Sequence, residues 1–246
     1  MSTSSGTTPK GITNEQQASV WVRGMFGKIA GRYDLLNHLL SFNLDRLWRR
    51  RLTNRVAHVL TDPNARVLDL CCGTGDVMLS LEKRRGAPVL GADFCHPMLV
   101  EAQRKVAAKG FRSKLFEGDG LQLPLADASL DLVTVSFGFR NFSNYERGLR
   151  ELLRVLKPGG TLAILEFSQP NNRLFAAVYN WFSFTLLPRV GGMISGSGEA
   201  YEYLPESIRK FPNAEGLRAK MLEAGYGAVE FEQLTFGAVA LHLGRK

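Results

Sequence analysis

The chain has 246 residues, of which 45% are hydrophobic, and its formal net charge at pH 7 is +8. This length suits one large α/β domain or two small ones, and the hydrophobic content excludes disorder over most of the chain. The cysteines Cys71, Cys72 and Cys95 are too few and too irregularly spaced for a disulfide framework or a zinc site, so no metal is expected.

Residues 1–13 are predicted to form a disordered tail, because residues 1–9 are small and polar and carry no apolar periodicity. They also lack the basic and apolar regions of a secretory signal, which predicts a cytoplasmic protein. The longest uncharged apolar run, residues 174–188, would give a helix of about 22 Å, whereas the hydrocarbon core of a bilayer is about 30 Å thick. We therefore expect no membrane-spanning segment.

Residues 14–60 are predicted to form a helical lid. Four polar residues in this segment recur at helical spacing, so we expect them on one side of a helix and apolar residues on another. The polar residues are Asp34, His38, Ser41 and Asp45, and the apolar ones are Leu36, Leu39, Leu40, Leu47 and Trp48. Asn43 tolerates the left-handed conformation, which predicts a turn before a basic helix that begins at Asp45. The polar stripe is either a solvated helix face or a face turned toward a site.

Positive charge is concentrated in the first quarter of the chain. Residues 1–60 hold nine basic side chains and three acidic ones. The basic residues are Lys10, Arg23, Lys28, Arg32, Arg46, Arg49, Arg50, Arg51 and Arg55. Such a cluster suits nucleic acid, an anionic membrane surface or a solvated helix face, and charge alone does not choose among them.

Short apolar runs alternate with amphipathic stretches from residue 66 onward, which predicts a parallel sheet covered by helices on both faces. The predicted strands are residues 66–70, 88–93, 113–118, 131–137 and 161–167, and the predicted helices are residues 76–85, 97–109 and 144–156. Residues 226–244 are typical of two further strands, joined through residues 235–237 as an antiparallel pair at the sheet edge. The fold class is therefore α/β.

A glycine-containing turn follows the first predicted strand in the sequence VLDLCCGTGD. Asp69 lies at the end of the strand, and Gly73 and Gly75 let the backbone approach a ligand at the start of a helix. A nicotinamide dinucleotide fingerprint needs a third small residue at the position that Met78 occupies, which excludes that cofactor class. A cofactor with a carboxylate and an ammonium group fits the turn better.

The next two strands also end in acidic residues. Asp93 is placed to accept hydrogen bonds from ribose hydroxyls, and Asp119 to reach an adenine amino group. Together with the LKPGG stretch before the fifth strand, these elements resemble the class I S-adenosylmethionine-dependent methyltransferases, which have a Rossmann-like sheet with an antiparallel C-terminal edge. The alternative is a doubly wound domain that binds another ligand.

Two longer stretches carry a closer resemblance. They resemble the two signature stretches of the ubiquinone/menaquinone biosynthesis C-methyltransferase family, and they read YDLLNHLLSFNLDRLW and RVLKPGGTLAILEFS. Four shorter stretches extend the likeness from about residue 20 to the C-terminus: SFGFRN, LLPRVGG, YEYLPESIRKFP and LTFGAVALHLG. The resemblance implies S-adenosyl-L-methionine as cofactor and C-methylation of a polyprenyl quinol, with demethylmenaquinol favoured over the methoxybenzoquinol of ubiquinone synthesis. The sequence departs from the family at Asp45, where a histidine is usual, and at Leu36, where a methionine is usual.

The resemblance also implies a division of the chain and a set of cofactor contacts. We expect one domain over residues 14–246, with a cofactor-binding core at 61–169, a substrate-side insertion at 170–212 and a C-terminal helix with edge strands at 213–246. Besides Asp69, Gly73 and Gly75, the expected cofactor-binding residues are Thr74, Asp93, Asp119, Gly120 and Ser136.

A quinol ring carbon becomes a good nucleophile when the adjacent hydroxyl loses its proton, which costs about 4 kcal/mol at pH 7 for a phenol with a pKa of about 10. Arg140 and Asn141 follow the fourth strand, so Arg140 is a candidate to stabilise the phenolate and Asn141 to orient the hydroxyl. Tyr33, Asp34 and His38 are the candidates to accept the proton, directly or through water.

A polyprenyl tail favours the bilayer, so we expect transient contact with the inner face of the membrane. Two sets of residues suit that contact. They are Arg49, Arg50, Arg51 and Arg55 for the anionic surface, and Phe175, Trp181, Phe182 and Phe184 for the tail, with core packing as the alternative for the aromatics. No nucleic acid is expected and a homodimer is left open. The alternative functions are methylation of RNA or another small molecule, and a non-catalytic scaffold of a quinone-synthesis complex.

Overall fold

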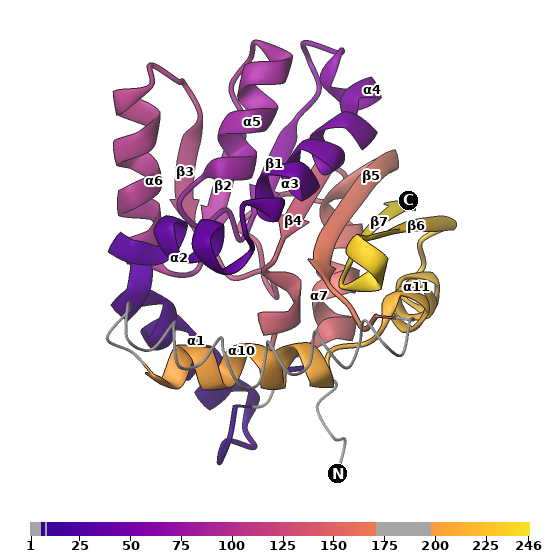
Figure 1. Ribbon diagram of the computed structural model, residues 1–246. Coiled ribbons are helices and arrows are strands. Elements are labelled where there is room, and N and C mark those ends of the chain that lie inside the picture. Colours follow the sequence, from indigo (N-terminus) through magenta and orange to yellow (C-terminus); the bar gives the residue numbers. More distant parts are fainter. Residues whose placement is uncertain (1–5, 8, 171–197) are drawn as a thin grey trace.

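The computed structural model describes residues 6–7, 9–170 and 198–246. Within them, a seven-stranded sheet has the order β3-β2-β1-β4-β5-β7-β6 (Figure 1). The strands are β1 (Val67–Leu70), β2 (Leu90–Asp93), β3 (Lys114–Glu117), β4 (Leu130–Ser136), β5 (Leu156–Phe167), β6 (Ala228–Leu234) and β7 (Val239–Arg245). Strands β1 to β5 are parallel, and β7 runs antiparallel to both β5 and β6. The predicted α/β sheet with an antiparallel C-terminal edge is confirmed.

The predicted strand at 161–167 begins earlier than expected. Strand β5 already starts at Leu156, which pairs with Leu130 before a register shift in β4. Gly159 in this stretch has a φ of +78° and donates its backbone N–H to the carbonyl of Lys246. Residues 157–160, between the predicted helix and the predicted strand, therefore belong to β5, and the chain passes directly from helix to strand.

Helices cover both faces of the sheet, as predicted (Figure 1). They include α5 (Asp76–Arg85), α6 (His96–Ala108), α7 (Tyr145–Val155) and α11 (Ala214–Glu223), whereas α10 (Gly198–Lys210) lies below the sheet. Helix α5 begins after Gly75 and ends at Gly86, both with positive φ, and the Asn144 side chain caps α7 by accepting the Arg147 N–H. The central strands β1 and β4 carry mainly buried residues, as a sheet covered on both faces requires.

The N-terminal segment is helical, as predicted. Its first part lies beyond the carboxyl ends of the strands, and its second part, residues 44–60, packs along α5 (Figure 1). The segment comprises α1 (Glu15–Ile29), the short 3-10 helix η1 (Ala30–Arg32), α2 (Tyr33–Leu40), α3 (Leu44–Arg55) and α4 (Ala57–Leu60). Helices α1 and α10 lie below the sheet in Figure 1. They pack together through Trp21 of α1 and Tyr203 of α10, whose ring centroids are 5.2 Å apart. Asn43 turns the chain with a φ of +61°, as predicted, although α3 begins at Leu44 and not at Asp45.

The predicted apolar side of this segment is only partly correct. Leu36 and Trp48 are buried, but Leu39 and Leu47 are 47% and 60% exposed. Leu39 lies with the exposed Leu35 on the outer side of α2. The left-handed residues between α2 and α3 break the helix, so the spacing counted across the break does not place Leu47 on the buried side. The side chain of Leu40 lies outside the described part of the chain.

The prediction of a disordered tail over residues 1–13 is wrong where the structure describes this segment. Thr7 is buried, and its backbone N–H donates to the carbonyl of Phe142 at 2.7 Å. Its hydroxyl forms a hydrogen bond with the hydroxyl of Tyr203 at 2.6 Å. A Cβ on Gly6 would lie 2.0 Å from the carbonyl oxygen of Ser143, so the backbone is packed closely here. These contacts join distant parts of the chain and leave no local pattern in the sequence.

None of the helices in the described ranges combines the length and the apolar character that a membrane crossing requires. The apolar run at 174–188 lies outside those ranges, as do the aromatic residues predicted to line a prenyl tail, Phe175, Trp181, Phe182 and Phe184.

Two helical glycines provide a test of packing. A Cβ on Gly148 of α7 would lie 2.4 Å from the ring of Phe142, whereas a Cβ on Gly24 of α1 would meet nothing within 4 Å. Gly148→Ala is expected to lower the free energy of unfolding by about 1–3 kcal/mol through overpacking. Gly24→Ala should raise it by about 0.5–1 kcal/mol through helix propensity alone. Urea denaturation measures both, and equal effects of the two substitutions would contradict the packing.

Candidate functional site

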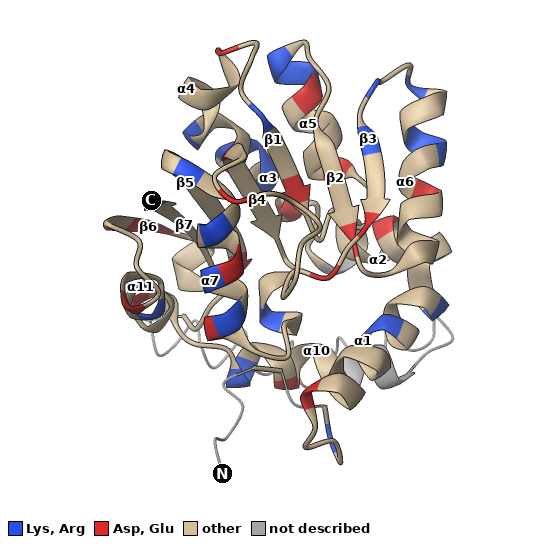
Figure 2. Cartoon of the chain, turned by 180° about the vertical axis from the view of Figure 1, so that it is seen from behind, with Lys and Arg blue, Asp and Glu red and all other residues tan. Residues whose placement is uncertain are grey.

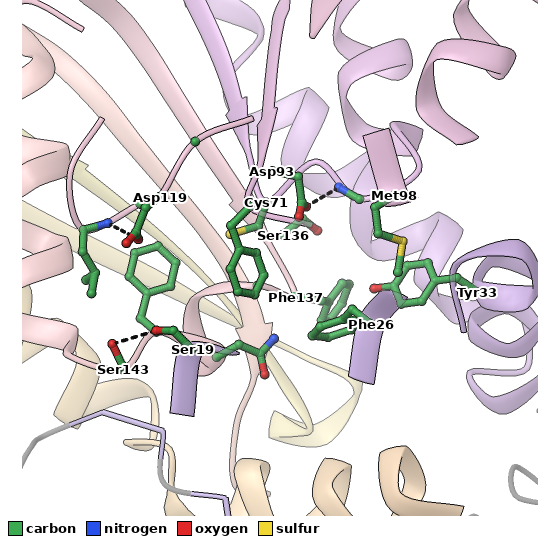
Figure 3. Close-up of a pocket in the computed structure, with 18 residues that line it drawn as sticks. Ser19, Phe26, Tyr33, Cys71, Asp93, Met98, Asp119, Ser136, Phe137 and Ser143 are labelled. Atoms are coloured by element: carbon green, nitrogen blue, oxygen red, sulfur yellow. Dashed lines mark hydrogen bonds between the residues drawn. The ribbon is translucent and has the colours of Figure 1, made fainter. Parts of the chain in front are cut away.

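Two adjoining cavities lie at the carboxyl ends of the strands. The larger has a volume of about 650 Å³ and is drawn in Figure 3, and the smaller has a volume of about 340 Å³. They share five lining residues, which are Tyr33, Cys71, Gly73, Ser136 and Phe137. In open α/β sheets ligands bind at this edge, so we take the two cavities together as the candidate site.

Strained backbone shapes the boundary between the cavities. Cys71 directly follows β1 and Phe137 directly follows β4, and their φ values are +54° and +57°. Non-glycine residues in this conformation cost about 1–3 kcal/mol each and tend to lie at functional sites. A Cβ on Gly138 would lie 2.3 Å from the Cβ of Cys71, so a glycine is required where the two loops meet.

Two acidic residues line the larger cavity, as the sequence predicts (Figure 3). Asp93 ends β2 and accepts hydrogen bonds from the backbone N–H groups of Gly73 and Cys95, both at 2.9 Å. Burial raises the pKa of Asp93 to about 6, against the lowering effect of these bonds. Asp119 accepts the N–H of Leu121 at 2.9 Å, and the adjacent Gly120 also lines the cavity.

Unsatisfied polar atoms mark the smaller cavity. Asp69 accepts a hydrogen bond from the hydroxyl of Thr134 through one oxygen, at 2.6 Å. Its other oxygen, Oδ2, and the hydroxyl oxygen of Ser136 are buried without a hydrogen-bond partner among the described residues. Burial raises the pKa of Asp69 to about 7. Buried polar groups normally have partners, so a bound molecule with hydrogen-bond donors would complete this site.

Arg140 and Asn141 lie on η2 (Phe139–Asn141), after β4. Asn141 lines the larger cavity, and its side-chain oxygen accepts a hydrogen bond from Tyr203 at 3.0 Å. Arg140 lines neither cavity. Its buried guanidinium forms an ion pair with Glu166 of β5 at 2.9 Å and donates to the carbonyl of Phe137 at 2.7 Å. Arg140 thus fixes the turn that presents Asn141.

The three predicted proton acceptors lie in different surroundings. Tyr33 lines both cavities, and burial raises the pKa of its hydroxyl. Asp34 accepts a hydrogen bond from the Thr74 hydroxyl and pairs with Lys105, each at 2.5 Å. His38 bonds to Asp45. Neither Asp34 nor His38 lines the two cavities.

Three of the four residues of the polar stripe form a network among themselves, whereas the fourth, Asp34, contacts Thr74 and Lys105. His38 Nδ1 lies 2.8 Å from Asp45 Oδ2, and the Ser41 hydroxyl donates to Asp45 Oδ1 at 2.8 Å. Asp45 in turn pairs with Arg49 at 3.1 Å. The network therefore holds the start of α3 against the end of α2, and it gives Asp45 a structural role.

Several residues of the site were missed by the sequence reasoning. Ser19 and Phe26 of α1 line the larger cavity, and Arg49 and Asp76 line the smaller one. Arg49 pairs with Asp76 at 2.5 Å, and Lys105 pairs with the same carboxylate at 2.7 Å. The only local signal is the spacing of four residues between Asp45 and Arg49, which is that of a helical ion pair.

The arginines predicted to meet a membrane are mostly engaged elsewhere. Arg49 belongs to the site, Arg51 forms two hydrogen bonds to Glu232, and Arg55 pairs with Glu230 and Glu232. Of the predicted group, Arg50 remains exposed and lines a wide basic groove.

Comparison with known proteins shows the family of this chain. The model of the ubiE/COQ5 methyltransferase family matches residues 12–246. Demethylmenaquinone methyltransferase of Thermus thermophilus is 50% identical over 221 residues, which cover 89% of this chain and 99% of that protein. Ubiquinone/menaquinone biosynthesis C-methyltransferase UbiE of Pseudomonas fluorescens is 40% identical over 246 residues, which cover 98% of this chain and 95% of that protein.

A solved structure gives the fold. A SAM dependent methyltransferase from Aquifex aeolicus aligns with a TM-score of 0.56 and 20% identity, covering 78% of this chain and 88% of that chain. This likeness confirms the predicted class I methyltransferase fold. Because the family model and the relatives cover nearly its whole length, the chain belongs to the ubiE/COQ5 methyltransferase family.

Proposed function

We propose that this protein transfers a methyl group from S-adenosyl-L-methionine to a ring carbon of a polyprenylated quinol, with demethylmenaquinol as the favoured acceptor. The names of the relatives support the acceptor class. The observation that carries the proposal is the pair of unpartnered buried oxygens, on Asp69 and Ser136, beside the glycine-containing turn. These oxygens fit a ligand that places an ammonium group in the smaller cavity, which adjoins the larger cavity lined by Asp93.

The lining residues fit each part of the cofactor. Asp93 is suited to the ribose hydroxyls, and Asp119 with Gly120 to the adenine. Asp69 and Ser136 are suited to the amino-acid end. Gly73, Thr74 and Gly75 form the turn between these parts, and the Thr74 hydroxyl is held by Asp34. When bound, the cofactor supplies a methyl group already activated by its positively charged sulfur, and positioning can supply much of the remaining rate enhancement.

On the acceptor side, we assign the orienting role to Asn141, because its amide lines the larger cavity and is itself fixed by Tyr203. Arg140 acts as a positioning residue through the turn that it anchors on Glu166. Burial raises the pKa of the Tyr33 hydroxyl, which is therefore protonated at neutral pH. This suits Tyr33 to donate a hydrogen bond to the quinol oxygen. Asp34 and His38 line neither cavity, so as proton acceptors they would act through water.

We also propose peripheral contact with the inner face of the membrane. A basic groove of about 1600 Å³ lies between α3, α5 and the end of α6, and Figure 2 shows basic residues on these helices in blue. Its exposed basic residues are Arg46, Arg50, Lys83, Arg84 and Lys109. The exposed leucines Leu35, Leu39 and Leu47 lie on α2 and on α3, and α3 also lines this groove. Exposed basic and apolar side chains on neighbouring helices suit an anionic bilayer surface.

Methyl transfer from labelled S-adenosyl-L-methionine is the direct test, with reduced demethylmenaquinol and a demethylated benzoquinol each presented in vesicles. Transfer to either quinol supports the proposal and shows the ring preference. Cofactor binding by calorimetry without transfer to either quinol would overturn it in favour of an RNA substrate or a non-catalytic scaffold.

Asn141→Ala is expected to lower kcat for methyl transfer about 10- to 100-fold, the value of one hydrogen bond to a developing charge, while the cofactor Kd stays near that of the unaltered protein. His38→Gln is the comparison. If His38 accepts the proton through water, this substitution changes the pH profile of kcat; if it only holds Asp45, the profile is unchanged. An unaltered kcat in Asn141→Ala would contradict the orienting role.

Cofactor affinity is expected to fall with falling pH. The pKa of Asp69 is about 7 and that of Asp93 is about 6, so both carboxyls are partly protonated near pH 6.5. The ligand donates to the ionised forms, so binding releases protons and the affinity falls up to about tenfold per pH unit for each proton released. Calorimetry in two buffers of different ionisation enthalpy measures the release. An affinity that is constant between about pH 5.5 and 8 would contradict the shifted pKa values.

Vesicle binding tests the membrane face. Arg46→Gln with Arg50→Gln should weaken binding to vesicles containing anionic lipid about 30-fold, because each of the two basic residues contributes about 1 kcal/mol near the surface. The matched control is Lys114→Gln with Arg150→Gln, which removes the same charge from exposed positions on β3 and α7. Equal weakening by both pairs would show that net charge, and not this face, sets the binding.

A further inference from the structure

We infer that Arg49 is a cofactor-binding residue, which recognises the α-carboxylate of the bound amino-acid end from the N-terminal helix α3. The inference rests on the proposed methyl donor and adds a residue outside the glycine-containing turn to its site. It would make the N-terminal helices part of the cofactor site and not only a lid above it.

The smaller cavity presents opposite charges to one small space. Arg49 and Asp69 both line it, and the guanidinium is close enough to lower the pKa of the Asp69 carboxyl against the effect of burial. Asp69 keeps one unpartnered oxygen, and the Ser136 hydroxyl beside it is also unpartnered. An α-amino acid carries an ammonium and a carboxylate on one carbon. Asp69 and Arg49 therefore form a complementary pair for its two charges.

The guanidinium of Arg49 is held in place but keeps donors to spare. Its side chain is 12% exposed, and Nη1 makes the ion pairs with Asp45 and Asp76. Within the described part of the chain, no ion pair or hydrogen bond uses its other nitrogens. Arginine has five N–H donors in a fixed plane, so a carboxylate in the cavity can be bound while both acidic residues stay paired.

Other charges around the cavity do not oppose this assignment. Asp76 also lines the cavity, but it pairs with both Arg49 and Lys105. Lys105 itself is occupied by Asp34, Asp76 and the Thr74 hydroxyl, and it does not line the cavity. Among the described residues that line the smaller cavity, Arg49 is therefore the cation.

A comparison of two ligands isolates the interaction. S-adenosyl-L-methionine and its decarboxylated analogue differ only in the carboxylate, and each is titrated against the unaltered protein, Arg49→Gln and Arg50→Gln by calorimetry. Arg50 is the matched control, because it is the next residue of the same helix and is exposed. The unaltered protein and Arg50→Gln should prefer the carboxylated ligand about 10- to 100-fold, and Arg49→Gln should reduce this preference to within about threefold.

The outcomes separate the inference from the proposed function. Equal weakening of both ligands by Arg49→Gln, with the preference kept, would show a purely structural role and overturn the inference. Binding of neither ligand by the unaltered protein would overturn the proposed function instead. Arg49→Lys keeps the charge and should keep part of the preference, and it replaces Arg49→Gln if thermal melting shows that the glutamine variant does not fold.

Discussion

The site depends on one carboxylate that joins three helices. Asp76, the first residue of α5, binds Arg49 of α3 and Lys105 of α6. A negative charge is favourable at a helix N-terminus, and here it also compensates two cations that would otherwise lie half-buried together. Through Lys105 the same cluster reaches Asp34 of α2 and the Thr74 hydroxyl. The glycine-containing turn, α6 and the N-terminal helices are therefore fixed relative to one another by a single group of charges.

The sheet supplies a second constraint on the same region. Asp69, Asp93 and Ser136 lie at the ends of neighbouring parallel strands, so the order of the strands alone brings them to one edge. The exact directions are then set by the left-handed residues Cys71 and Phe137. The loops that follow these strands are therefore fixed on one side by the hydrogen bonds of the sheet and on the other by the ion pairs around Asp76. Binding energy is then not needed to order these loops.

Prediction from the sequence succeeded where a feature depends on local pattern. Apolar runs marked the strands, and the acidic residues after them marked Asp93 and Asp119 as lining residues. It failed where contacts join distant segments, as for Arg49 in the smaller cavity and Arg140 beside Glu166. Leu47 was misplaced because helical spacing was carried across the turn at Asn43, and Leu39 because α2 buries Leu36 but not the leucine three positions later. Charge composition could not say which arginines would be neutralised by Glu230 and Glu232.

The hydrogen bonds from Thr7 to Tyr203, and from Tyr203 to Asn141, bear on how the protein is made. The first of them joins residues 196 positions apart in the chain. During synthesis the amino-terminal side is finished long before α10 leaves the ribosome, so the contacts that hold Asn141 at the larger cavity form among the last events of folding. The sheet core from β1 to β5 can be complete by then. A nascent chain would thus hold the strand-end carboxylates of the cofactor site before Asn141 has the hydrogen bond that fixes it.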